Sequence, residues 1–99
     1  MSVGIDVPQA SIAAFCRRNA IQRLSLFGSV LRDDFSPESD VDILVEFEPG
    51  AQVGLHFFRL ELELSELLGR RVDLNTLGFL SVHFRDQILG EAEVVYAAQ

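Results

Sequence analysis

Two aspartates that stand two positions apart are the residues of this sequence best suited to chemistry. Asp40 and Asp42 flank Val41 at the start of an alternating apolar run. Side chains two apart on an extended chain point to the same side, so both carboxylates would face one spot. Converging carboxylates repel each other, and a hard divalent cation supplies the compensating charge. The pair therefore predicts a Mg²⁺ site that water and phosphate oxygens complete.

A glycine and a serine upstream of the aspartates are suited to binding phosphate. Gly28 and Ser29 end an apolar run, and glycine lets the backbone approach a ligand closely. We expect Ser29 to be the N-cap of a short helical turn, whose free N–H groups attract phosphate. Arg32 lies in the same turn, where it either supports a phosphate or is a solvated helix residue.

Asp73 is the candidate for a third carboxylate. Its neighbours Val72 and Leu74 would share the opposite face of a short strand. If that strand pairs beside the strand carrying Asp42, Asp73 points to the same side of the sheet. The alternative is that Asp73 is an ordinary surface residue of a strand.

The elements that must position these side chains follow from hydrophobic period and from Gly and Pro. They form an α+β fold, a small mixed β-sheet flanked by helices, within one domain over residues 1–99. The expected helices are Pro8–Arg18, Val53–Leu68 with Gly69 as its C-cap, and Phe79–Leu89 ended by Gly90; the expected strands are Ile21–Phe27, Val41–Phe47, Arg71–Asn75 and an edge strand Glu93–Tyr96.

Composition excludes several classes of function. The net charge is −7 and all 8 basic residues are arginines without a long run, which argues against direct nucleic-acid binding. The single cysteine, Cys16, cannot form an internal disulfide and is expected in the core. No signal peptide or membrane-spanning run is evident, so we expect a cytoplasmic protein without a membrane partner.

The quoted residues resemble the nucleotidyltransferase superfamily of DNA polymerase beta, and most closely its minimal nucleotidyltransferase (MNT) branch. The resemblance rests on LSLFGS at 24–29, on Arg32, on SDVDILV at 39–45 and on LLGRRVDL at 67–74. It implies a polymerase beta-like core. One departure stands out, because Asp33 occupies a position that is usually glycine, and an added negative charge facing the pocket would weaken nucleotide affinity.

The resemblance also implies a reaction. An acceptor hydroxyl would attack the α-phosphate of ATP, and pyrophosphate would leave. Asp40 and Asp42 would hold two Mg²⁺ ions, and Asp73 would bind the metal nearer the acceptor and help to deprotonate it. The residues implied in nucleotide binding are Gly28, Ser29, Arg32 and Ser39.

A partner is implied by the same family. Members of the MNT branch are paired with a helical HEPN protein, as antitoxin with toxin. The resemblance implies that the MNT protein transfers AMP to a tyrosine of that toxin within a complex of the two proteins. Two alternatives stay open at this point. The chain could neutralise its partner without catalysis by masking its active surface, or it could modify a small molecule, although an acceptor-binding domain is lacking.

Overall fold

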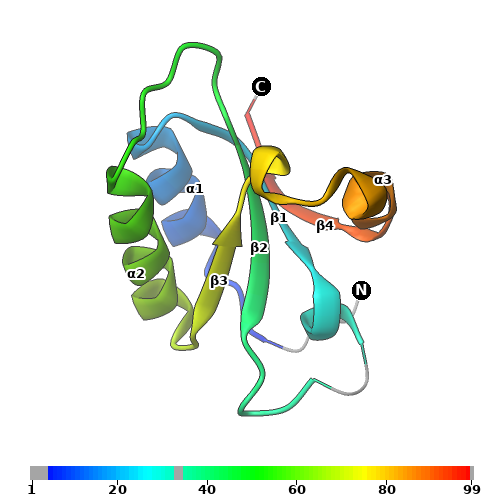
Figure 1. Ribbon diagram of the computed structural model, residues 1–99. Coiled ribbons are helices and arrows are strands. Elements are labelled where there is room, and N and C mark those ends of the chain that lie inside the picture. Colours follow the sequence, from blue (N-terminus) through cyan, green and yellow to red (C-terminus); the bar gives the residue numbers. More distant parts are fainter. Residues whose placement is uncertain (1–4, 33–34, 99) are drawn as a thin grey trace.

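The computed structural model describes residues 5–32 and 35–98, which form an α+β fold around one mixed four-stranded sheet (Figure 1). Asp33 lies outside the described residues. The described elements are α1 (Gln9–Arg18), β1 (Ile21–Phe27), the 3-10 turn η1 (Gly28–Leu31), β2 (Val41–Phe47), α2 (His56–Leu68), β3 (Val72–Asn75), the 3-10 turn η2 (Leu77–Phe79), α3 (Val82–Glu91) and β4 (Glu93–Ala97).

The order of the strands brings three segment ends together. The sheet runs β3-β2-β1-β4, with β1 antiparallel to both β2 and β4 and with β2 parallel to β3. In this register Phe27 pairs with Asp42, and Asp42 pairs with Asp73. The end of β1 therefore meets the beginnings of β2 and β3 at one end of the sheet, which is where the candidate site residues lie.

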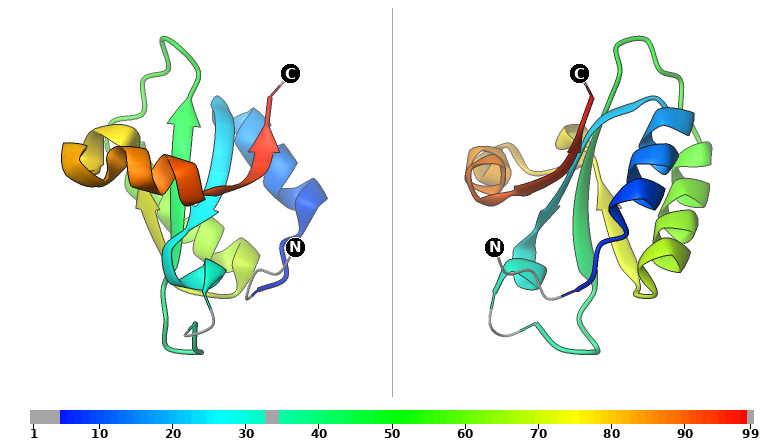
Figure 2. Two further views of the ribbon diagram at one scale, coloured as in Figure 1. Left: turned by 90° about the vertical axis from the view of Figure 1, so that its right-hand side faces the viewer. Right: turned by 180° about the vertical axis from the view of Figure 1, so that it is seen from behind.

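One face of the sheet carries the hydrophobic core. Helices α1 and α2 lie side by side on that face in both figures (Figures 1 and 2). The core side chains come from alternate positions of the strands and from one stripe of each helix, including Ile12, Phe15, Cys16, Leu26, Val41, Ile43, Val45, Phe57, Leu60 and Leu64. Cys16 is fully buried, as expected, and burial raises the pKa of its thiol to about 12, so the thiol is inert.

The other face is covered much more thinly. Figure 2 shows α3 and η1 on the side of the sheet that faces away from α1 and α2. None of the residues of α3 is buried. Leu44 points away from the main core but is only 1% exposed, and Ser25 and Phe27 of β1 are buried on the same face, so this face still buries several strand side chains. A helix held this loosely over a sheet leaves room for a cleft beneath it.

The expected strands Ile21–Phe27 and Val41–Phe47 are confirmed to the residue, whereas the start of the second helix is wrong. The helix expected from Val53 begins at His56. Gly54 explains the difference, because its φ of +55° is left-handed and cannot belong to a right-handed helix. Gly69 ends the helix in the left-handed conformation, as expected.

The last helix also differs from the expectation. It begins at Val82, where Ser81 is the N-cap and its side chain accepts a hydrogen bond from the backbone N–H of His83. Gly90 does not end the helix, which continues to Glu91. Within the described ranges, no helix is both long enough and apolar enough to cross a membrane.

Candidate active site

Asp42 lies next to Asp73 across the parallel pair β2 and β3. The pKa of the Asp42 carboxyl is raised to about 6, first by partial burial and then by the negative charges of Asp73 and Asp40, in that order. A hydrogen bond with the side chain of Asp73 acts in the same direction, while the positive charge of Arg32 opposes it. The two carboxylates therefore favour a shared proton or a bound cation.

Asp40 precedes β2 and adds its charge to the same spot, but its carboxylate has another contact. Asp40 Oδ1 lies 3.7 Å from Nη1 of Arg71, whose side chain is 82% exposed. Within residues 5–32 and 35–98, no three Asp, Glu, His or Cys side chains are already arranged as a metal-binding cluster. An exposed ion pair of this kind contributes at most about 1 kcal/mol, so a cation could readily compete for Asp40.

Gly28 brings the backbone of the β1–η1 turn against the Asp42 carboxylate. Its φ is +77°, and an added Cβ would overlap Oδ2 of Asp42 and lie 3.1 Å from its Cγ. Glycine is thus required both by the left-handed conformation and by the lack of space. The oxygen-only side chains beside this tight backbone turn fit a hard divalent cation that is shared with a phosphate.

Ser29 and Arg32 belong to the turn that follows. The expectation that Ser29 is an N-cap is wrong, because η1 already begins at Gly28 and its N-cap is Phe27, without a side-chain cap. The Ser29 carbonyl accepts a hydrogen bond of 2.9 Å from the Arg32 backbone N–H. A single 3-10 turn has little dipole, so attraction of phosphate must come mainly from side chains and from individual N–H groups.

Ser39 organises the loop that leads into Asp40. Its Oγ accepts a hydrogen bond of 3.1 Å from the Ser36 backbone N–H. Nη2 of Arg70 donates to the backbone carbonyls of Ser36 and Ser39 at 2.7 and 3.0 Å, and the guanidinium lies 4.5 Å from the ring centre of Phe35. Ser39 does not line the cleft beside Asp42, so its role in nucleotide binding stays a prediction. Nothing in the sequence pattern indicates that Arg70 holds this loop in place.

A cleft of about 380 Å³ lies over the glycine turn, within the size range of small-molecule sites. The sheet side contributes Phe27, Gly28, Ser29, Arg32 and Asp42. The opposite wall is α3, which contributes Phe84, Gln87, Ile88 and Glu91. Sequence reasoning missed this wall, although the spacing of these four residues places them on one helical face.

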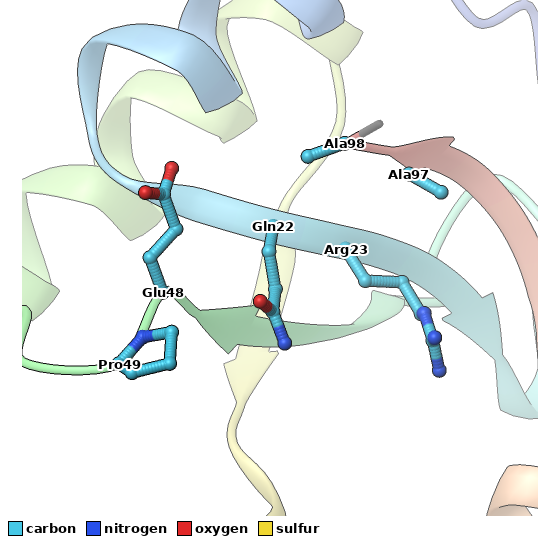
Figure 3. A pocket seen from close by; sticks show the side chains of 6 residues that line it. All are labelled: Gln22, Arg23, Glu48, Pro49, Ala97 and Ala98. Atoms are coloured by element: carbon cyan, nitrogen blue, oxygen red, sulfur yellow. The ribbon is translucent and has the colours of Figure 1, made fainter.

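A second cleft, of about 460 Å³, lies at the opposite end of β1 (Figure 3). The side chains drawn there do not converge on a common point (Figure 3). Arg23, which lines it, lies 3.4 Å from Glu46 in an exposed ion pair. Asp42 lines only the smaller cleft, whereas Asp40 and Asp73 line neither cleft and lie beside Asp42 at the end of the sheet, so the chemistry belongs to the smaller cleft.

Comparison with known proteins gives a consistent family. A family model described as the nucleotidyltransferase domain matches residues 10–95. A proposed protein adenylyltransferase of Methanocaldococcus jannaschii is 41% identical over 90 residues, which cover 91% of this chain and 96% of that protein. The protein adenylyltransferase MntA of Thermococcus cleftensis is 40% identical over 79 residues, 80% of this chain and 77% of its own.

Solved structures agree on the fold. A proposed minimal nucleotidyltransferase superposes with a TM-score of 0.71 at 39% identity and covers 85% of each chain. A complex of a tri-AMPylated Shewanella oneidensis HEPN toxin with an MNT antitoxin gives a TM-score of 0.65 at 24% identity, covering 92% of this chain and 71% of that one. At this identity the second likeness shows the fold alone.

Proposed function

The chain belongs to the nucleotidyltransferase domain family, and from that premise we propose that it transfers AMP from ATP to a tyrosine hydroxyl of a HEPN-type toxin and thereby acts as an antitoxin. The proposal treats residues 1–99 as one catalytic domain. Both relatives described above are named as protein adenylyltransferases, which favours a protein acceptor over a small molecule.

The observation that carries the proposal is the position of Asp42. It faces Asp73 on one side, the glycine turn at Gly28 on the other, and the charge of Asp40 from the end of its own strand. This arrangement unites excess negative charge with a close backbone approach. A purely structural turn has no need for a half-buried carboxylate whose pKa is raised by two others.

The residues of the chain can be given separate tasks. Gly28 and Ser29 would contact the triphosphate through backbone N–H groups and the serine hydroxyl, while Arg32 would add a positive charge at the mouth of the cleft. Asp73 is exposed at the β3 edge, where its carboxylate can accept the proton of an incoming hydroxyl. Two Mg²⁺ ions held by Asp40, Asp42 and Asp73 would neutralise the phosphate charge when bound.

The surface of the protein also favours a protein partner, in agreement with the names of its relatives. Phe58 and Leu62 on α2 and Leu55 directly before the helix are each at least 60% exposed. Contiguous apolar side chains of this kind mark protein-interaction surfaces. The net charge of −7 complements a basic, RNA-cleaving toxin, and a complex of the two proteins follows from the proposal.

The proposal is tested with a purified HEPN-domain protein, the class of partner that the proposal names. The two purified proteins are incubated with ATP and Mg²⁺, and the partner is examined by intact-mass and peptide mass spectrometry. We expect one or more AMP groups on a tyrosine of the partner. The variant Asp40→Asn/Asp42→Asn should abolish the modification, while Glu46→Gln, a carboxylate removed from the same strand further along, should not.

The same variants separate catalysis from masking. Cells expressing the toxin should survive with the wild-type chain and with Glu46→Gln, but not with the double aspartate variant, provided that this variant still folds by circular dichroism. Protection by a folded, transfer-inactive double variant would show that binding alone neutralises the toxin. That result would overturn the catalytic account of the antitoxin.

A further inference from the structure

We propose that the α3 wall of the cleft is the nucleobase subsite, in which Phe84 stacks on the base and Gln87 with Glu91 recognises the amino group of adenine. This inference rests on the proposed function, because it concerns the nucleotide that occupies the same cleft. It adds specificity for the nucleobase, provided by residues that take no part in binding the phosphates or the metal ions.

Phe84 is an aromatic side chain placed where a base could stack. It is 58% exposed, yet it lines the cleft that also contains Gly28, Ser29 and Asp42. Its ring is therefore open to a ligand that occupies the cleft, and a base stacked on it would remove apolar surface from water. Aromatic side chains that stack on bases are worth on the order of tenfold or more in affinity for each base.

Other exposed aromatic residues are accounted for differently. The ring of Phe79 packs edge-on against Phe57 with centroids 5.1 Å apart. Phe58 also contacts Phe57 and lies on α2, on the far side of the sheet. Of the phenylalanines in the described ranges, only Phe27 and Phe84 line the cleft, and Phe27 is buried within β1.

The two walls of the cleft suit different parts of a nucleotide, the glycine turn the phosphates and α3 the base. η1 and α3 lie on the same side of the sheet (Figure 2), and the cleft separates the Gly28 turn from α3. The triphosphate belongs at the glycine turn and beside Asp42, so the base extends toward α3. Phe84, Gln87 and Glu91 lie one turn apart in succession on that helix, and all three border the cleft.

Gln87 and Glu91 give this wall a preference for hydrogen-bond donors. Nε2 of Gln87 donates to Oε1 of Glu91 at 3.3 Å, which directs the amide oxygen of Gln87 away from Glu91. The free oxygens of both side chains can only accept hydrogen bonds. The exocyclic amino group of adenine can donate to these oxygens, whereas the corresponding O6 of guanine accepts and would be repelled by the Glu91 carboxylate, leaving only the second N–H of Gln87 to pair with it. The wall therefore favours ATP over GTP.

A tryptophan probe tests the stacking directly, because the chain contains no tryptophan. The variant Phe84→Trp is titrated with ATP and with inorganic tripolyphosphate, both with Mg²⁺. We expect ATP to quench the emission strongly and tripolyphosphate to leave it nearly unchanged. The matched variant Phe79→Trp, whose ring packs outside the cleft, should respond to neither.

Calorimetry of the unlabelled protein gives the affinities. Phe84→Ala and Phe84→Leu should weaken ATP binding about tenfold and leave tripolyphosphate binding unaltered. Leucine keeps an apolar side chain on α3 but has no ring, so it separates stacking from packing. Gln87→Leu/Glu91→Gln should bring the ATP and GTP affinities within about twofold of each other.

Three results would overturn the subsite. Unchanged ATP affinity in both Phe84 variants would remove the stacking role and leave the phosphate site intact. Equal losses of ATP and tripolyphosphate would show that Phe84 only shapes the cleft. If the wild-type protein binds neither ligand, with or without its partner, the proposed function fails together with the subsite, which distinguishes that failure from the first two.

Discussion

Gly28 and Asp42 approach each other so closely that a Cβ on residue 28 would overlap Oδ2 of Asp42 and lie 3.1 Å from its Cγ. The contact crosses from the end of β1 to the beginning of β2, where Phe27 and Asp42 are paired. The backbone turn and the carboxylate are therefore parts of one site, and a substitution in either should change the conformation of the other.

The variant Gly28→Ala should cost about 3 kcal/mol of the free energy of unfolding, because it adds crowding to the strain of a positive φ. Gly50→Ala is the matched control, since Gly50 has φ +84° but nothing within 4 Å of an added Cβ. Strain alone should cost that variant about 1 kcal/mol. Urea unfolding measures both, and equal losses would contradict the close approach.

Asp42→Asn should stabilise the protein without metal above pH 6. The pKa of Asp42 is raised from 3.8 to about 6, so between these values the folded state binds more protons than the unfolded state. The free energy of unfolding therefore falls as pH rises through this window, and the loss persists above it. Asparagine avoids that loss, by about 1 kcal/mol after allowance for partial exposure.

Thermal or urea unfolding between pH 4 and pH 8 checks the sign of this effect. The gain of the Asn variant over the wild type should be near zero at pH 4, grow up to about pH 6 and then level off. A variant that is less stable than the wild type at pH 8 in the presence of a chelator would contradict the crowding of carboxylates at this position.

Arg71→Gln should tighten Mg²⁺ binding about twofold at low salt, because it removes the cation that lies 3.7 Å from Asp40. Arg59→Gln removes the same charge from the exposed side of α2 and should have a smaller effect. Calorimetric titration with Mg²⁺ measures the difference, which should shrink as salt screens the exposed pair. Weaker binding in Arg71→Gln would mean that Arg71 supports the site instead of competing with the cation.

Arg70→Lys should loosen the loop before Asp40. Lysine keeps the charge but cannot hold the carbonyls of Ser36 and Ser39 with one planar group that also stacks on Phe35. We expect a loss of about 1–2 kcal/mol in the free energy of unfolding. Faster hydrogen exchange at the Ser39 amide would report the loop itself; unchanged exchange would remove Arg70 from its support.

The sequence predicts the parts of the molecule that depend on local periodicity. The alternation from Val41 to Phe47 and the break at Gly28 give the bounds of β1 and β2, and Val72 and Leu74 are buried while Asp73 is exposed. The sequence places Asp73 beside Asp42 only if their two strands pair, and the parallel register of β2 and β3 meets that condition.

What could not be predicted depends on long-range placement. α3 has no buried residue, so no apolar stripe marks which of its sides meets the cleft. Arg70 supports a loop more than 30 residues away in the chain, and Arg71 takes up one of the Asp40 oxygens. Neither contact leaves a periodic signal, because each depends on how β3 is placed against the start of β2.

The central claim is that the site at Asp42 transfers the nucleotide part of ATP. The most direct measurement supplies the protein and the proposed HEPN partner with ATP carrying a radioactive label at either the α- or the γ-phosphate, together with Mg²⁺. The account predicts that the α-label becomes attached to the partner, that the γ-label appears only in pyrophosphate, and that Asp42→Asn abolishes both signals. Attachment of the γ-label, or α-label transfer that persists in a folded Asp42→Asn variant, would contradict it.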